Sequence, residues 1–325
     1  MECVLPKPNI DLVYQTSYGS MYCGEAEKIL LSDDLKPFHK NVQLIFTSPP
    51  FPLNRKKKYG NYQGEEFIDW LAKFAPLFKN YLKSNGSIVM EMGNAWVPGK
   101  PVMSPLALRA LLKFLEEGDF HLCQQFIAYN PARLPSPAQW VNVDRIRVKD
   151  SFTHIWWMSP SDKPHADNRQ VLKKYSKAMQ QLLSNKKYNA GKRPSEHKIS
   201  QDAFFRDNDG AIPSNVITVA NTNSSDDYLR YCRLHDLQPH PARMPVLLPE
   251  FFIKFLTTPG SIVLDPFAGS NTTGSTAEKL ERRWVSIEVN KTYVESSKGR
   301  FVNFVKMGDE FNDNHGILPG NTGSD

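Results

Sequence analysis

The sequence predicts an α/β protein whose mainly parallel sheet is covered by helices. Short β-rich runs that end in turn residues alternate with stretches in which apolar residues recur every three or four positions. Such alternation is typical of parallel strands joined by crossover helices. The chain has 325 residues, 40% of them hydrophobic, so it can bury a sizeable core and is not disordered as a whole.

Apolar or β-branched runs closed by Gly, Pro or acidic residues predict the strands. The predicted strands are residues 19–24, 41–50, 86–93, 121–131, 153–160, 261–265 and 284–289. Residues 64–83 carry one apolar stripe, and Pro76 predicts that this helix is kinked or split in two. A second helix is expected at 104–117, with Ser104 as its N-cap and Pro105 at its first position. Later helices are expected at 247–256, from Asn271-Thr272 onward, and at 291–304.

Residues 161–240 break this pattern, because they are polar and basic and show little periodicity. We interpret them as an inserted, loop-rich region that departs from the sheet. The chain then divides into residues 1–160, the insertion, residues 241–307, and a Gly-, Asn- and Asp-rich tail. We expect that tail, residues 308–325, to be disordered.

Composition excludes several classes of protein. Four widely spaced cysteines and eight histidines without metal-ligand spacing predict neither a disulfide framework nor a metal site. No apolar run approaches the roughly 18 residues of a membrane helix, and the first residues lack the pattern of a signal peptide. We therefore expect a soluble, cytoplasmic protein. Its net charge of +6 is compatible with a nucleic-acid partner.

Residues 261–274 join a strand to a helix through a turn of small residues. The small residues let a ligand approach the backbone, and the helix N-terminus offers free N–H groups. Asp265 at the strand end suits a ligand with an ammonium or hydroxyl group. Glu288 closes the next strand 23 residues later, a spacing that suits an acid gripping a ribose diol. The alternative interpretation is an ordinary strand–turn–helix with a surface acid.

A second motif, Ser48-Pro49-Pro50-Phe51, ends the strand at 41–50. The prolines hold Ser48 extended and remove N–H donors, so the turn presents the Ser48 hydroxyl and the Pro49 carbonyl as acceptors beside an aromatic ring. An exocyclic amino group on a planar base needs two acceptors in its plane and a ring above it. Taken alone, the same four residues also fit an ordinary loop after a strand.

Together the two motifs resemble those of the β-type amino DNA methyltransferases, which use S-adenosyl-L-methionine. Ser48 precedes Asp265 by 217 residues, which is similar to the circularly permuted order of that group, with a target-recognition region between the motifs. The likeness to PvuII-type N4-cytosine-specific methyltransferases covers about residues 19–304. It includes the stretches SPPF, RKKKYGN, LPSPAQWVN, IRVKD, RPSEH, HPARMP and LPEFFI.

This resemblance implies a circularly permuted, Rossmann-like methyltransferase sheet in an enzyme that acts on duplex DNA. We also expect the enzyme to be a monomer. The resemblance implies a restriction–modification system with a cognate restriction endonuclease, and no metal. Its catalytic turn corresponds to Ser48, Pro49, Pro50 and Phe51. Its cofactor site corresponds to Glu25, Asp265, Phe267, Gly269, Ser270, Asn271, Thr272 and Glu288. Glu25 departs from the aspartate that is usual there, while Glu288 matches the ribose ligand.

Arg55, Lys56, Lys57 and Lys58 directly follow the turn. Such a run is usually a solvated face, but here it borders the pocket that a phosphate backbone has to pass, so we predict DNA contacts. Glu91 ends the strand at 86–93 and is either a second polar group near the target amine or an ordinary strand end.

Several substrates stay open at this point. No cysteine follows a proline, which disfavours methylation at cytosine C5 because that reaction needs a thiolate. Adenine N6 carries an amino group beside a ring nitrogen just as cytosine N4 does, although serine before Pro-Pro favours cytosine within the family. An RNA or protein amide is also possible as substrate, as is a DNA-binding protein that has kept the fold and lost catalysis.

Overall fold

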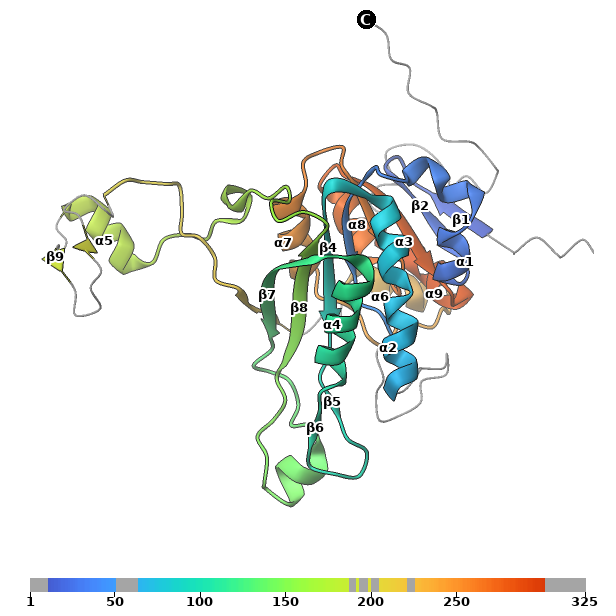
Figure 1. The fold of residues 1–325 in the computed structure, drawn as a ribbon, viewed down its shortest axis with the longest axis horizontal. Coiled ribbons are helices and arrows are strands. Elements are labelled where there is room, and N and C mark those ends of the chain that lie inside the picture. The colour runs from blue at the N-terminus through green and yellow to red at the C-terminus, as the bar shows by residue number, and fades with distance from the viewer. Residues whose placement is uncertain are drawn as a thin grey trace, which may run out of the picture.

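A nine-stranded sheet forms the centre of the molecule (Figure 1). The computed structural model describes residues 11–50, 64–186, 191–192, 198–199, 205–220 and 226–301. The strands of the sheet are β1 (Asp11–Gln15), β2 (Gly19–Cys23), β3 (Val42–Thr47), β4 (Leu82–Met92), β7 (His121–Tyr129), β8 (Phe152–Ser159), β11 (Val216–Thr218), β12 (Ile262–Asp265) and β13 (Arg283–Glu288).

These strands lie in the order β1-β2-β13-β12-β3-β4-β8-β7-β11. All of them run in one direction except β1 and β8, which are antiparallel to their neighbours. The prediction of a mainly parallel α/β sheet is therefore confirmed. The last two strands of the chain, β12 and β13, lie in the middle of the sheet between β2 and β3.

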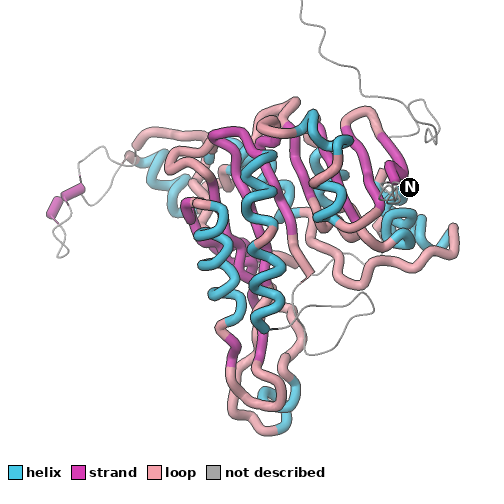
Figure 2. The backbone as a smooth tube through the Cα atoms, turned by 45° about the vertical axis from the view of Figure 1, so that its right-hand side comes forward, coloured by secondary structure: helices cyan, strands magenta, loops and turns pink. Residues whose placement is uncertain are grey.

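Helices cover both faces of the sheet (Figures 1 and 2). One face carries α1 (Ala26–Leu30), η1 (Asp33–Phe38), α2 (Gly64–Ala72), α3 (Phe74–Tyr81) and α4 (Leu106–Gly118). The other face carries α7 (Leu247–Leu256), α8 (Thr272–Lys279) and α9 (Lys291–Ser297). The remaining elements are β5 (Ala95–Trp96), β6 (Met103–Ser104), η2 (Gln139–Val143), η3 (Asn168–Val171), α5 (Lys177–Asn185), β9 (Gly191–Lys192), β10 (Lys198–Ile199), α6 (Asp227–Leu234) and η4 (Lys298–Arg300). None of the helices in these ranges has the length and apolarity to cross a membrane.

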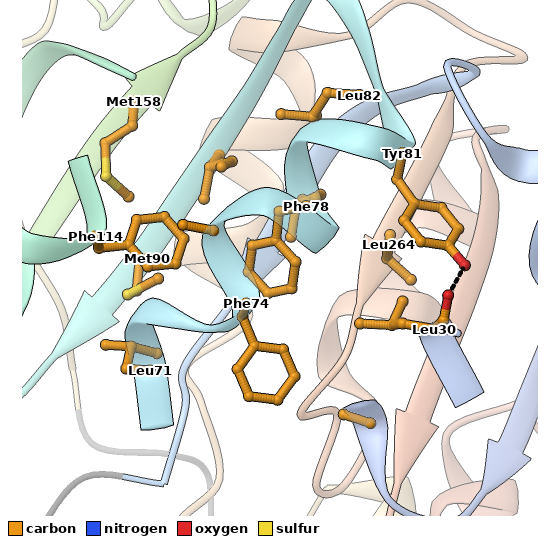
Figure 3. Close-up of a cluster of buried hydrophobic side chains, with 14 of the residues drawn as sticks. Leu30, Leu71, Phe74, Phe78, Tyr81, Leu82, Met90, Phe114, Met158 and Leu264 are labelled. Atoms are coloured by element: carbon orange, nitrogen blue, oxygen red, sulfur yellow. Dashed lines mark hydrogen bonds between the residues drawn. The ribbon is translucent and has the colours of Figure 1, made fainter. Parts of the chain in front are cut away.

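Each face of the sheet has its own apolar core. Every residue of β3 is buried, as expected for a strand with helices on both sides. Figure 3 shows part of one core, in which Phe74 and Phe78 of α3 lie near Phe114 of α4. The predicted split of the helix at 64–83 is confirmed: α2 ends before Lys73 and Pro76 lies in the first turn of α3, where proline is tolerated.

The start of α4 differs from the prediction. Ser104 belongs to β6, where it pairs with Ala95, and Pro105 is the N-cap residue instead of the first helical residue. The Ser104 hydroxyl still accepts a hydrogen bond from the Leu106 N–H at 3.3 Å. Strand pairing, which is not visible in the local sequence, moved the helix start by one residue.

The region predicted as an insertion returns to the sheet before it ends. β11 extends the edge of the sheet parallel to β7, with Ile217 buried, and α6 packs against α9 and η4. A three-residue strand is too short to show the alternation of apolar and polar residues, so the sequence analysis did not predict it. By contrast α5 has no buried residue among those described and lies apart from the sheet in Figure 1. Residues 308–325 lie outside the described ranges.

Candidate active site

A cavity of about 600 Å³ opens at the carboxyl ends of the parallel strands. Ser48 follows β3, Asp265 and Glu288 end β12 and β13, and Glu91 lies near the end of β4; all four line the cavity. Open α/β sheets bind ligands at this edge. The two motifs singled out in the sequence therefore share one cavity because β3 and β12 are neighbours in the sheet.

Asp265 is the most strongly bonded carboxylate of the cavity. It is buried and accepts hydrogen bonds from the hydroxyls of Thr47 (2.8 Å) and Thr273 (2.6 Å) and from the Phe267 N–H (3.1 Å). Burial nevertheless raises the pKa of Asp265 to about 6. No cation in the described part of the chain forms an ion pair with it. A buried, charged carboxylate of this kind is suited to a cationic ligand.

Glu288 fastens the loop that follows β12. Its two carboxylate oxygens accept hydrogen bonds from the N–H groups of Gly269 and Asn290, each at 2.9 Å. Burial raises the pKa of Glu288, and the charge of nearby Asp265 raises it further. The two acids therefore stand side by side along the cavity, as expected for successive parallel strands.

The loop itself needs a glycine at position 269. Gly269 has φ = 53°, and a Cβ placed on it would lie 3.2 Å from the ring of His240. Ser270 and Thr272 also line the cavity, whereas Asn271 does not. The Asn271 side chain caps α8 and bonds to the hydroxyls of Tyr14 and Ser286, so its contacts in the structure are structural.

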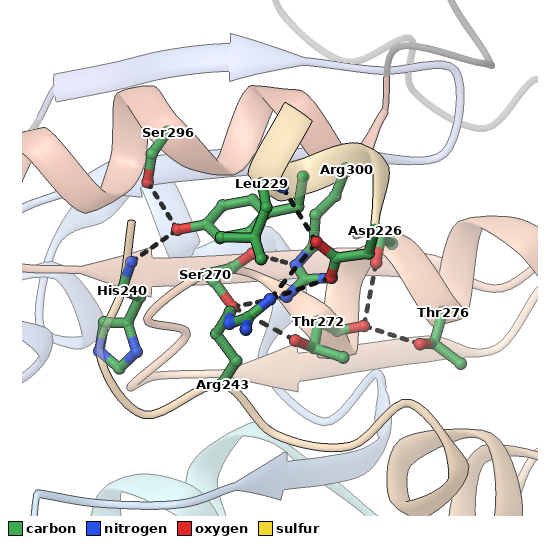
Figure 4. Close-up of polar contacts among 11 residues, drawn as sticks. Asp226, Leu229, His240, Arg243, Ser270, Thr272, Thr276, Ser296 and Arg300 are labelled. Atoms are coloured by element: carbon green, nitrogen blue, oxygen red, sulfur yellow. Dashed lines mark hydrogen bonds and ion pairs between the residues drawn. The ribbon is translucent and has the colours of Figure 1, made fainter. Parts of the chain in front are cut away.

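Two arginines from distant segments surround this loop (Figure 4). Arg300 donates to the Ser270 carbonyl at 2.7 Å and to its hydroxyl at 2.9 Å. Arg243 and Arg300 both face the carboxylate of Asp226, at 3.2 Å and 4.0 Å. Asp226 caps the N-terminus of α6. Through these contacts the segment predicted as an insertion reaches the loop after β12.

The opposite side of the cavity is built around Glu91. The Thr153 hydroxyl donates to its carboxylate at 2.9 Å, and the Ser48 hydroxyl also hydrogen-bonds to it. Burial raises the pKa of Glu91, while these two bonds and the charge of Arg133 act in the opposite direction. Glu91 is thus a polar group of the site beside Ser48 and not merely a solvated strand end.

Aromatic and charged side chains also line the cavity. Phe267 packs against Trp70 and Phe74, with ring centroids 5.5 and 5.1 Å apart. Glu25 lines the cavity as an exposed residue, and its carboxylate lies 2.7 Å from the Lys28 ammonium. Pro49 and Pro50 also line the cavity.

Five predicted residues lie outside the described residues, namely Phe51, Arg55, Lys56, Lys57 and Lys58. Within the described ranges, no cluster of three or more His, Cys, Asp or Glu could hold a metal ion.

Sequence reasoning missed the arginines of the site. Arg133 and Arg243 both line the cavity, and each stands in the same pattern, Pro-Ala-Arg-x-Pro, at 131–135 and 241–245. Five residues are too few to identify a repeat from one sequence. Arg300 gave no signal, because it lies in a helix end whose position beside Ser270 depends on the tertiary fold.

Comparisons with known proteins agree with this arrangement. The N6/N4 methyltransferase family model, described as "DNA methylase", matches residues 42–299. The chain is 42% identical over 291 residues to the type II methyltransferase M.PvuII of Proteus hauseri, covering 89% of this chain and 85% of that one. A solved structure of PvuII DNA methyltransferase (cytosine-N4-specific) superposes with a TM-score of 0.71 at 37% identity, covering 90% of each chain. A putative DNA modification methylase from Thermus thermophilus, solved in complex with S-adenosyl-L-methionine, shares the fold at 19% identity. Its TM-score is 0.53, and the match covers 87% of this chain and 93% of that one.

Proposed function

The chain belongs to the N6/N4 DNA methylase family, and we propose that it moves a methyl group from S-adenosyl-L-methionine to the exocyclic N4 of a cytosine in duplex DNA. The observation that carries this proposal is the shared cavity, in which the Ser48 turn faces the same space as the carboxylates of Asp265 and Glu288. The similarity to a cytosine-N4-specific enzyme over 90% of the chain favours cytosine over adenine.

The residues of the β12 side fit the cofactor. S-adenosyl-L-methionine, when bound, supplies a methyl group on a positively charged sulfur, and it also carries an ammonium group and a ribose diol. Asp265 is buried and forms no ion pair with a cation of the described ranges, so it is the group that would attract the ammonium, and Glu288 would accept from the ribose hydroxyls. Gly269 leaves the loop without a side chain between backbone and ligand. Phe267, Ser270, Thr272 and, at the rim, Glu25 complete the proposed cofactor site.

Ser48 and Pro49 would hold the target amino group. The cytosine N4 lone pair is delocalised into the ring, so the amine is a weak nucleophile. Acceptors that hold both amino hydrogens favour a pyramidal nitrogen, whose lone pair is then free to attack the methyl group. The Ser48 hydroxyl and the Pro49 carbonyl are such acceptors, and both residues line the cavity. Phe51 remains the residue expected to stack on the flipped base. Positioning and fixed dipoles would then supply much of the acceleration.

Glu91 is the group that would remove the proton. The amino nitrogen becomes positively charged when it gains a methyl group, and it has to lose a proton to a base to become neutral again. The Glu91 carboxylate hydrogen-bonds the Ser48 hydroxyl, and its raised pKa makes it a better proton acceptor near neutral pH than an ordinary glutamate. We therefore assign Glu91 as the proton acceptor, directly or through Ser48.

The remaining predictions follow from the same proposal. We interpret the position of β12 and β13 between β2 and β3 as the circular permutation expected from the motif order. Residues 161–240 would contribute to target recognition, and the basic run at 55–58 would contact phosphates. The enzyme would act as a monomer in the cytoplasm and protect DNA from a cognate restriction endonuclease.

The test is nucleoside mass spectrometry of plasmid DNA from cells that express the protein and lack their own methyltransferases. We expect N4-methylcytosine with the wild type and none with Ser48→Ala. N6-methyladenine would overturn the base assignment but keep the cofactor. A DNA sample without any modified base, from cells that contain folded protein, would overturn the proposed reaction on DNA.

A further inference from the structure

A long arm projects from the carboxyl edge of the sheet, at the bottom of Figure 1. We define the arm as residues 95–104 and 131–151, which include β5, β6 and η2. Its two segments pack together through Trp96 and Trp140, with ring centroids 5.4 Å apart. Arg147 adds two hydrogen bonds to the Pro101 carbonyl, at 2.7 and 3.1 Å. The arm is thus an ordered part of the fold, and Arg133 is the arm residue that has so far been placed at the cavity.

The arm exposes large apolar side chains to solvent. Val148 and Leu134 have exposed fractions of 86% and 82%, the two highest values for large hydrophobic residues in the described part of the chain. The arm's other exposed apolar residues are Val102, Met103, Val143 and Ile146. A concentration of exposed apolar side chains on one element indicates an interaction surface.

The base of the arm lies at the mouth of the cavity. Arg133 lines the cavity, and Leu134 is the next residue. The segment that leads into β8 runs beside it, because the Asn130 N–H donates to the Ser151 carbonyl at 2.8 Å and the Asp150 N–H to the Ser136 carbonyl at 3.0 Å. When a base leaves the duplex and enters the cavity, the gap that it leaves in the base stack would therefore lie close to Leu134.

The charge of the arm suits a polyanion. Its five cations are Lys100, Arg133, Arg145, Arg147 and Lys149, against two carboxylates, Asp144 and Asp150. None of the ion pairs found within the described ranges involves any of these cations. Arg133, Arg147 and Lys149 instead donate to backbone carbonyls, which are neutral acceptors. The charge of Arg133 also acts on the Glu91 carboxylate inside the cavity. The two carboxylates accept from the amides of Gln139 and Asn94.

From these observations we propose that the base of the arm docks on the substrate duplex and that Leu134 fills the space left by the flipped cytosine. Lys149, whose ammonium lies 2.7 Å from the Pro131 carbonyl, contacts a neighbouring phosphate. Apolar side chains inserted between base steps stabilise unstacked DNA in this way. The inference rests on the proposed reaction and adds to it the element that keeps the base out of the stack.

The test of Leu134 uses two duplexes that carry the target site mapped on plasmid DNA. In one, the cytosine is paired with guanine; in the other it faces an abasic site, so it is already unpaired. We expect Leu134→Ala to lower the single-turnover rate about tenfold or more on the paired duplex and much less on the abasic one, because only the first has to be opened. Leu112→Ala is the matched control, since Leu112 is 65% exposed on α4, outside the arm and the cavity lining.

The outcomes separate this inference from the proposed function. A wild type without activity on either duplex would overturn the proposed reaction itself. An active wild type with an equally active Leu134→Ala variant would overturn only the role of the arm. Light scattering, which measures the oligomeric state, is the second readout. A dimeric wild type and a monomeric Leu134→Ala variant of equal activity would mean that the apolar surface binds a second copy of the chain instead of DNA.

Lys149 is tested by the salt dependence of binding to plasmid DNA. We expect Lys149→Gln to reduce the slope of log affinity against log salt by about one, the value for one lost phosphate contact. Lys40→Gln is the control, because the Lys40 ammonium also bonds a backbone carbonyl, that of Lys79 at 2.9 Å. Lys40 precedes β3 and so lies at the amino ends of the parallel strands, away from the cavity. Equal slopes for the two variants would contradict the docking of the arm.

Discussion

The Thr47 hydroxyl donates a hydrogen bond of 2.8 Å to the carboxylate of Asp265, 218 residues further along the chain. Both side chains are buried, and each stands at the end of its strand. The bond joins the strand that leads to Ser48 with the strand that leads to the proposed cofactor loop. It therefore sets the relative position of the two groups between which a methyl group would pass.

Thr47→Val should weaken both stability and cofactor binding. The substitution preserves shape but leaves the buried carboxylate with one donor fewer, which we expect to cost about 1–3 kcal/mol of unfolding free energy. It should also raise the pKa of Asp265. Urea unfolding and calorimetric titration with S-adenosyl-L-methionine measure the two effects. Thr276→Val is the control, since the Thr276 hydroxyl bonds to the Thr272 carbonyl and to no other group of the described residues, so its loss should leave the pH dependence of binding unchanged.

Cofactor affinity should depend on pH through Asp265. Burial raises the pKa of Asp265 to about 6, so below that pH a proton competes with the ammonium of the ligand. Affinity should fall up to tenfold for each pH unit below 6, and Asp265→Asn should flatten this dependence. Stability of the free protein should change in the opposite direction. Between the usual pKa of 3.8 and about 6 the folded state binds the extra proton, so the unfolding free energy falls as pH rises. A wild-type affinity independent of pH from 5 to 7 would contradict the assigned role.

Glu91→Gln should slow the reaction without removing the fold. Glutamine keeps the shape and can still accept from Thr153, but it takes up no proton, so the single-turnover rate should fall roughly 10²-fold or more. The wild-type rate should decrease as pH falls through the raised pKa of Glu91, because the protonated acid is no longer an acceptor. A variant that keeps this pH profile would exclude Glu91 as the base.

Asp226→Asn should weaken cofactor binding while leaving the rate at saturating cofactor unchanged. Asparagine still caps α6, so the substitution removes the charge that faces Arg243 and Arg300 but keeps the helix. Without that charge Arg300 is less firmly placed against Ser270. Asp227→Asn is the matched control on the same helix, because Asp227 pairs with the exposed Arg230. Equal dissociation constants for the two variants would argue against the network.

Gly269→Ala should lower the unfolding free energy by more than the backbone strain of a positive φ alone. Gly99 has φ = 71° with nothing within 4 Å of its Cβ position, so Gly99→Ala measures that strain alone, about 1 kcal/mol. At Gly269 the added methyl group would also press on His240 at 3.2 Å. We expect a larger loss of unfolding free energy and a weaker affinity for S-adenosyl-L-methionine. An equal loss of unfolding free energy in Gly269→Ala and Gly99→Ala would show that the contact with His240 does not affect stability.

The sequence by itself determined the elements whose cause is local. Apolar spacing predicted the helices over 64–83 and 247–256, and small residues after Asp265 predicted a ligand-binding turn, which lines the cavity. Proline chemistry alone predicted that Ser48 presents acceptors. Periodicity and turn residues act within a few positions of the chain, so one sequence is enough to see them.

Only the tertiary structure decided which of these elements meet. Strand pairing is non-local, so nothing near Ser48 indicates that its strand lies beside that of Asp265. The same holds for Arg300, which reaches the site from a segment without any motif of its own. Asn271 was predicted to contact the ligand from its sequence position, and only the structure shows that its side chain also caps α8. Side-chain direction and long-range pairing follow from the packed fold, which residue order alone does not reveal.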